Sequence, residues 1–169
     1  MTPVFRAPEP PGAQNPDDPA GADLLLEAES LAAASGAGRL PTPLRGKNLG
    51  ILCKHAGGAA ATLFASAASE LGAHVVCIPI TLTDQSSLTV IRDTAALLSR
   101  LYDAVECLDM SPLLVELMQE SANIPLFFGL SSDAHWTVAL AARMSRGCGL
   151  PSDARRAMLQ AALVQALPS

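Results

Sequence analysis

The turn at residues 54–61 carries the residue types best suited to hold an anion. Lys54 and His55 offer positive charge, while Gly57 and Gly58 let the backbone turn tightly and present free N–H groups where a helix begins. The spacing fits neither G-x-G-x-x-G nor G-x-x-x-x-G-K-[ST], which argues against a nucleotide site. Taken alone, these residues favour a plain tight turn before a buried Ala-rich helix, with a weak anion site as the alternative.

His135 is the second candidate for ligand contact. It stands at the predicted start of a helix beside Trp136, where it could hydrogen-bond a small polar molecule. The favoured interpretation is plainer: a helix-terminal histidine without a ligand, next to a tryptophan that fills space. For His74 a structural role is expected, and Asp84 and Asp133 are interpreted as solvated loop carboxylates.

Strand-like and helix-like runs must position these residues, and they alternate along the chain. Strands are expected at 48–54, 74–80, 104–108 and 124–128, and helices at 23–34, 57–71, 87–102, from Pro112 with Ser111 as N-cap, 135–145 and 152–167. This alternation predicts the α/β class, a three-layer αβα domain with a four-stranded or slightly larger parallel sheet. Ligands of such sheets bind at the carboxyl ends of the strands, where both candidate turns lie.

Composition excludes several classes of function. The 169 residues carry a net charge of -5 without a basic stripe, which argues against nucleic acid, and no apolar run reaches the about 18 residues of a membrane span. The four cysteines form no C-x-x-C pair, so a reducing cytoplasm is predicted, with no disulfide, metal site or cofactor. Residues 1–20 contain six prolines and are expected to be a disordered leader before a single domain at 21–169.

Several short motifs follow one another in a fixed order. Residues 44–53, L-R-G-K-N-L-G-I-L-C, are similar to L-K-G-K-T-L-x-x-I-F, and the stretches at 64–74, 93–104, 115–117 and 124–131 match F-E-x-A-x-x-x-L-G-G-H, D-T-A-R-V-L-S-R with D-A-I, V-E-E-L-A and V-P-V-I-N-G-L-[ST]-D. Together they resemble the ornithine and aspartate carbamoyltransferases, closer to the ornithine branch. The resemblance covers about 24–142 and implies the carbamoyl-phosphate-binding N-terminal domain, with helix 152–167 packing back on it and the amino-acid-binding domain missing.

The resemblance implies that the phosphate-binding motif is degenerate in this chain. The family uses a Ser-Thr-Arg-Thr-Arg run where residues 57–61 here read Gly-Gly-Ala-Ala-Ala, and a further family arginine falls on Leu108. Of the H-P-x-Q motif, whose groups contact the carbamoyl moiety, only the histidine remains. Because a small dianion needs fixed positive charge and bidentate donors, no carbamoyl transfer and no catalytic residue are expected. What remains is a degenerate anion site of Lys54, His55, Gly57, Gly58, Ala59 and His135.

Three functions are compatible with these observations. The first is a pseudoenzyme of amino acid metabolism, a scaffold or regulatory oligomer; the resemblance implies a homotrimer or an assembly with a catalytic relative. The second is a module that binds a small anion or metabolite. The third is a diverged carbamoyl or carboxyl transferase subunit completed by a partner chain. In the family's trimers a neighbour's loop reaches the site, but the corresponding residues 81–89 contain no Lys or Arg, which argues against rescue in a homotrimer.

Overall fold

The computed structural model describes residues 19–146 and 150–167. Most of the predicted leader, and Cys148, lie outside these residues. The first helix begins at Pro19 rather than near residue 23, because a proline suits the first turn of a helix. In chain order the elements are α1 (Pro19–Gly36), β1 (Asn48–Cys53), α2 (Ala59–Glu70), β2 (His74–Pro79), α3 (Leu88–Leu101), β3 (Ala104–Cys107), α4 (Pro112–Gln119), β4 (Leu126–Phe128), α5 (Thr137–Ser145) and α6 (Pro151–Ala166).

The strands form one parallel sheet in the order β2-β1-β3-β4. In the middle, β1 places Ile51 opposite Cys77 of β2 and Leu52 opposite Cys107 of β3. On its other side β3 pairs with β4, where Cys107 lies opposite Phe128. The predicted α/β fold with a four-stranded parallel sheet is confirmed. Since all strands run the same way, the loops that follow them lie along one edge of the sheet.

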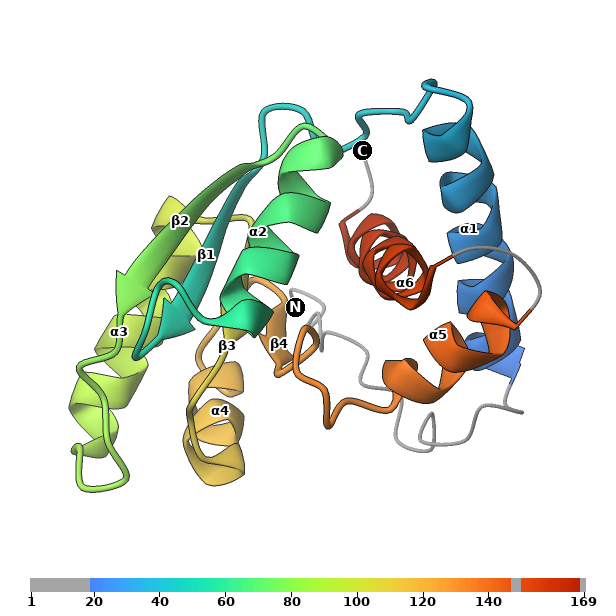
Figure 1. Cartoon of the computed structure of the whole chain (residues 1–169). Coiled ribbons are helices and arrows are strands. Elements are labelled where there is room, and N and C mark those ends of the chain that lie inside the picture. The colour runs from blue at the N-terminus through green and yellow to red at the C-terminus, as the bar shows by residue number, and fades with distance from the viewer. Residues whose placement is uncertain (1–18, 147–149, 168–169) are drawn as a thin grey trace.

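Helices cover both faces of the sheet (Figure 1). On one face α3 and α4 pack their apolar sides, including Leu98 and Met118, against Leu52 of β1. On the other face α2 and α6, with α1 and α5 beyond them, form a larger cluster in which Ile51 and Leu159 are buried. Successive residues of β1 therefore serve opposite clusters, as the alternation of side chains along a strand requires.

Two predicted helix ends are confirmed in detail. Ser111 caps α4, its Oγ accepting from the Leu114 amide at 3.3 Å, and Pro112 occupies the first turn. After α2 ends, Gly72 adopts a φ of 92°, a left-handed conformation that side chains disfavour. A Cβ added there would lie 3.2 Å from backbone atoms of Arg45. Both ends are thus determined by the residue type that the local geometry demands.

The last helix packs against α1, α5 and α2. Gln160 is buried and donates from Nε2 to the Ala67 carbonyl at 3.3 Å and to Glu70 Oε2 at 2.8 Å. At the surface, Arg156 pairs with the same Glu70 at 3.5 Å. These contacts tie α6 to the helix that follows β1. Among the described helices, none has both the length and the apolar character of a membrane span.

Candidate functional site

The turn after β1 leads directly into α2 and is open to solvent. Lys54 and His55 are exposed, and the Gly58 amide donates to the His55 carbonyl at 3.1 Å. Gly58 is the N-cap residue of α2, and no side chain caps this helix. A Cβ added at Gly57 would meet no atom within 4 Å, so the turn does not require glycine there for steric reasons. The backbone N–H groups of the first turn of α2 are therefore the main donors at this position.

Asp109 places a negative charge beside this turn. It directly follows Leu108, the position of the expected arginine, and its φ of 57° lies in the left-handed region that aspartate tolerates better than most residues. Its Oδ2 accepts a hydrogen bond from the Lys54 amide at 3.3 Å. A dianion that approaches the turn therefore meets a carboxylate close to where it needs positive charge.

The described cysteines are free thiols. Burial raises the pKa of both Cys53 and Cys107, and for Cys53 the neighbouring Cys77 and then Asp109 raise it further. A raised pKa lowers the fraction of reactive thiolate, so neither buried thiol is poised as a nucleophile. Within residues 19–146 and 150–167, no group of three or more His, Cys, Asp or Glu side chains gathers where it could hold a metal ion.

His135 lies in the loop that follows β4, just before α5. Its Nδ1 lies 2.9 Å from Thr137 Oγ1 and accepts from the Thr137 amide at 3.4 Å. The ring is partly buried, and its centroid lies 5.6 Å from that of Trp136. Burial, and then the Arg155 guanidinium, lower the pKa of His135 to about 4. The ring is therefore neutral near pH 7 and offers no positive charge to an anion.

A buried polar network that the sequence analysis missed adjoins His135. Arg155 of α6 donates from Nη1 to Thr137 Oγ1 at 2.8 Å, and from Nη2 to the carbonyls of Leu130 at 2.7 Å and Ser132 at 2.8 Å. These bonds join the C-terminal helix to the loop between β4 and α5. The loop that carries His135 is thus positioned by a residue from the far end of the sequence.

Glu106 extends the network into the sheet. Its side chain is fully buried in β3, and Oε1 accepts from both the amide and the hydroxyl of Ser131 at 3.0 Å. Oε2 has no partner among the described residues. Burial raises the pKa of Glu106 to about 8, although Ser131 and then Arg155 oppose the shift. Near neutral pH the Glu106 carboxyl is mainly protonated, because its pKa is raised to about 8. For Arg155, burial lowers the pKa, and Asp133 and Glu106 raise it.

The sequence contains a weak signal for this network. Glu106 stands between Val105 and Cys107 in an apolar strand, and Arg155 lies four residues before the buried Leu159 on the last helix. Charged residues are almost never fully buried unless they are paired, so a charge at a core position indicates a buried partner. The identity of each partner depends on which loops meet in the fold, and the spacing along the chain does not reveal it.

The predicted site residues fall into two separate groups. Residues 54–59 share the turn after β1, whereas His135 follows β4, and β3 lies between these two strands. Throughout the described chain, no hydrogen bond or ion pair joins the two groups. His74 is exposed on β2, and Asp84 is an exposed loop carboxylate that accepts from the Ser111 hydroxyl.

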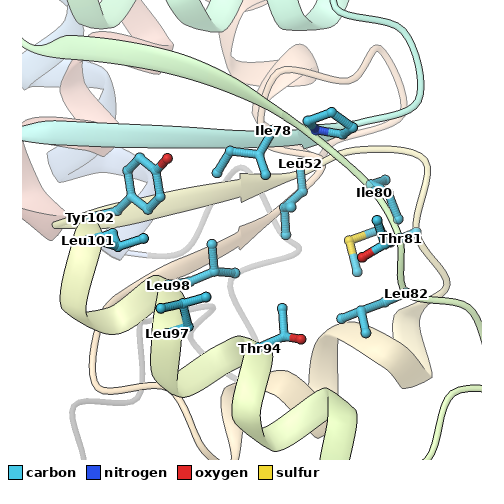
Figure 2. A pocket seen from close by; sticks show the side chains of 12 residues that line it. Leu52, Ile78, Ile80, Thr81, Leu82, Thr94, Leu97, Leu98, Leu101 and Tyr102 are labelled. Carbon is cyan, nitrogen blue, oxygen red and sulfur yellow. The ribbon is translucent and has the colours of Figure 1, made fainter.

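Figure 2 shows an apolar pocket beside α3, on the face of the sheet where Leu52 and Leu98 are buried. It is formed between the end of β2, the segment after it and helix α3, with Ile78, Leu82, Leu98 and Tyr102 among its lining side chains. Threonine hydroxyls and the phenol are its polar side-chain groups, and no charged side chain lines it. The pocket is therefore unsuited to an anion and is separate from both groups of predicted site residues.

Comparison with known proteins identifies carbamoyltransferases as relatives. The chain is 33% identical over 118 residues to an ornithine carbamoyltransferase of Actinobacillus pleuropneumoniae, a match that covers 70% of this chain and 35% of the relative. It is 33% identical over 98 residues to that of Cutibacterium acnes, covering 58% and 29%. The chain thus spans about a third of the length of the curated relatives it matches. No protein-family model matches it.

Solved structures give the same relationship. Ornithine carbamoyltransferase from Pyrococcus furiosus superimposes with a TM-score of 0.63 at 27% identity, covering 73% of this chain and 40% of that one. The catalytic subunit of M. jannaschii aspartate transcarbamoylase, at 21% identity and a TM-score of 0.58, covers 73% and 41% and shows the shared fold. The homologues and structural neighbours are therefore ornithine and aspartate carbamoyltransferases, and their coverage of about 70% of the chain is consistent with one domain of that family.

Proposed function

We propose that this chain, a relative of the ornithine and aspartate carbamoyltransferases, is a non-catalytic protein that has lost the phosphate-binding and carbamoyl-binding motifs. We further propose that it acts in the cytoplasm as a scaffold or regulatory oligomer, built on a single domain at 21–169. The observation that carries the proposal is the start of α2. There the side chains at 57–61 are hydrogens and methyl groups, and no side chain caps the helix.

The groups around this turn do not compensate for the lost side chains. The Asp109 carboxylate lies beside Lys54, and His135 is neutral near pH 7 because its pKa is lowered to about 4. Arg155 is buried, and its two terminal nitrogens already donate to Thr137 and to loop carbonyls. Lys54, whose side chain is exposed, is therefore the main cation near the turn, and its long flexible stem makes it a poor substitute for a bidentate arginine.

The magnitudes decide against tight binding of carbamoyl phosphate. Micromolar affinity corresponds to about 8 kcal/mol, and truncating one partner of a buried charge pair typically costs about 2–5 kcal/mol. Two missing arginines and three missing hydroxyls at 57–61 are enough to remove the whole of that affinity. Transfer would also lack the groups that stabilise the departing phosphate.

Calorimetry and a citrulline assay test this proposal. We expect no saturable heat when carbamoyl phosphate is titrated into the purified full chain, and no citrulline above background with ornithine present. An ornithine carbamoyltransferase measured under the same conditions is the positive control. Saturable binding at micromolar concentration, or turnover above background, would overturn the proposal.

We propose a homotrimer, or an assembly with a catalytic relative, as the state in which the chain works. Exposed apolar side chains support an assembly: Leu97 and Leu101 of α3 are 55% and 56% exposed, and Val76 of the edge strand β2 is 49% exposed. Light scattering should give about three times the 17.4 kDa chain mass. The double variant Leu97→Glu with Leu101→Glu should be monomeric, and the exposed Leu26→Glu on α1 is the matched control. A monomeric wild type, alone and mixed with a catalytic relative, would contradict this.

A small-anion or metabolite-binding module is the alternative that one observation favours. The amides of the first turn of α2 have no side-chain acceptor, and the adjacent turn is open. A ligand that binds the native state stabilises it by about 2.7 kcal/mol when its concentration is a hundred times its Kd, and this raises the melting temperature. A thermal-shift series with phosphate, carbamoyl phosphate and amino acids therefore tests it. An upward shift with phosphate that is lost in Ala59→Pro, which removes a backbone amide of the first turn of α2, but not in the distant Gly36→Ala, would favour the module over the scaffold.

A further inference from the structure

The contacts of the His135 ring define which ring nitrogen carries hydrogen. Nδ1 accepts a hydrogen bond from the Thr137 backbone amide at 3.4 Å and lies 2.9 Å from the Thr137 hydroxyl oxygen. A backbone amide can only donate, so Nδ1 must present its lone pair. A hydrogen on Nδ1 could be accepted by the Thr137 hydroxyl, but it would also face the Thr137 amide hydrogen, so the amide favours an Nδ1 without hydrogen. In a neutral imidazole the other nitrogen, Nε2, must then carry the hydrogen.

Arg155 determines the direction of the neighbouring hydroxyl. Its Nη1 donates to Thr137 Oγ1 at 2.8 Å, and a guanidinium has no acceptor. The hydroxyl accepts that bond and keeps one hydrogen of its own, and an Nδ1 without hydrogen, 2.9 Å away, is the acceptor for it. The three side chains thus form one directed chain of hydrogen bonds, from Arg155 through Thr137 to His135.

The guanidinium is itself held in place. Its Nη2 donates to the Leu130 carbonyl at 2.7 Å and to the Ser132 carbonyl at 2.8 Å. Both carbonyls belong to the loop that carries His135, and Arg155 comes from α6. The direction of the hydrogen-bond chain is therefore set by the packing of the C-terminal helix rather than by the loop alone.

We infer that Arg155 and Thr137 are positioning residues that hold His135 as a neutral ring with its hydrogen on Nε2, ready to donate to a ligand oxygen. The described residues offer Nε2 no acceptor of their own. This assignment gives the loop after β4 a fixed hydrogen-bond donor without charge, in place of the cation that an anion site would need. It deepens the account of the site in the proposed function but does not depend on whether carbamoyl phosphate binds.

The charges around the ring support the same state. Arg155 from α6 faces it, and a protonated imidazole would repel that guanidinium. Asp133 from the loop and Glu106 from β3 interact with Arg155. Since Glu106 is mainly protonated below about pH 8, it does little to favour a second positive charge. Burial is the larger cause of the lowered pKa of His135, and this repulsion lowers it further.

Imidazole nitrogen NMR on the 15N-labelled full chain tests the inference. The sequence has three histidines, and the signals lost in His135→Gln identify the ring in question. At pH about 5.5 an unperturbed histidine is mainly charged. We expect His135 to be neutral at that pH, with Nε2 protonated and Nδ1 unprotonated. A charged ring, or one protonated on Nδ1, would overturn the inference.

Two matched pairs of variants separate positioning from stability. Thr137→Val removes the hydroxyl and should shift the tautomer ratio roughly fivefold towards Nδ1–H, the effect of one hydrogen bond, whereas Thr137→Ser should preserve the wild-type pattern. Arg155→Gln should shift the ratio in the same direction, and the neighbouring, more exposed Arg156→Gln should not. Valine and serine variants with identical imidazole spectra would refute the role of Thr137.

The two proposals fail separately. No ligand is present in the NMR experiment, so binding of carbamoyl phosphate in the calorimeter would leave the tautomer assignment intact. A wrong tautomer would likewise leave the binding result unchanged. If Arg155→Gln does not fold, the Thr137 pair alone decides, because valine and threonine have nearly the same shape.

Discussion

Replacing Glu106 with glutamine should change how the stability of the protein depends on pH. The carboxyl group is fully buried, its Oε1 accepts two hydrogen bonds from Ser131, and its pKa is raised to about 8 by burial. Glu106→Gln keeps the shape and an acceptor oxygen but removes the titration. The variant therefore isolates the contribution of one buried ionisable group.

The sign follows from proton binding. The ordinary pKa of the group is 4.5, so between about pH 4.5 and 8 the folded chain holds a proton that the unfolded chain has released. The stabilising contribution of Glu106 is then fully present at low pH. It falls as the pH rises, by at most about 1.4 kcal/mol per pH unit. His135 acts in the opposite sense, because its pKa is lowered from 6.5 to about 4 and its contribution is lost as the pH falls through that range. The two slopes oppose each other below pH 6.5.

The effect of Glu106 is therefore clearest between pH 6.5 and 8. Over this range the free energy of unfolding of the wild type should fall by up to about 2 kcal/mol because of Glu106. Urea unfolding at both pH values measures the loss. Glu106→Gln should lose far less, and Glu116→Gln, an exposed glutamate on α4, should behave as the wild type. Every other titrating group is common to the three proteins, so only the difference between them matters. Equal losses in wild type and Glu106→Gln would refute a raised pKa at this site.

Three further tests of the packing use urea unfolding, two of them with a matched control substitution. Ala61→Arg, at a position 2% exposed, should cost several kcal/mol, about 3 or more, whereas Ala59→Arg at the exposed start of α2 should stay within about 0.5 kcal/mol. Gly50→Ala should cost at most about 1–3 kcal/mol, because the added Cβ would lie 2.8 Å from the terminal methyl of Ile78, which can shift, and 3.3 Å from Val105; a larger loss would contradict that local accommodation. Arg155→Gln should cost about 2–4 kcal/mol and Arg156→Gln less than about 1 kcal/mol; similar losses would argue against the buried network.

Much of the fold could be predicted because its signals are local. Side chains alternate in strands and repeat every 3.6 residues in helices, so the runs that became β1 and α3 were recognisable one at a time. Ser111 before Pro112 predicted the start of α4 because a helix needs an acceptor for its first amides and tolerates proline there. The sequence pattern predicts that α5 begins at His135, whereas it begins at Thr137, because the histidine ring bonds the first helical residue and periodicity does not register such a contact.

The candidate site was determined only in part by the sequence. Residue types alone located the open turn at 54–59 and the histidine after β4, because both follow strands whose carboxyl ends must share an edge. The tertiary structure alone decided that Arg155 and Glu106 meet the same loop, and that burial, and then Arg155, lower the pKa of His135 so that the ring is neutral. Such effects arise from burial and from partners tens of residues away, and local patterns along a chain carry no information about either.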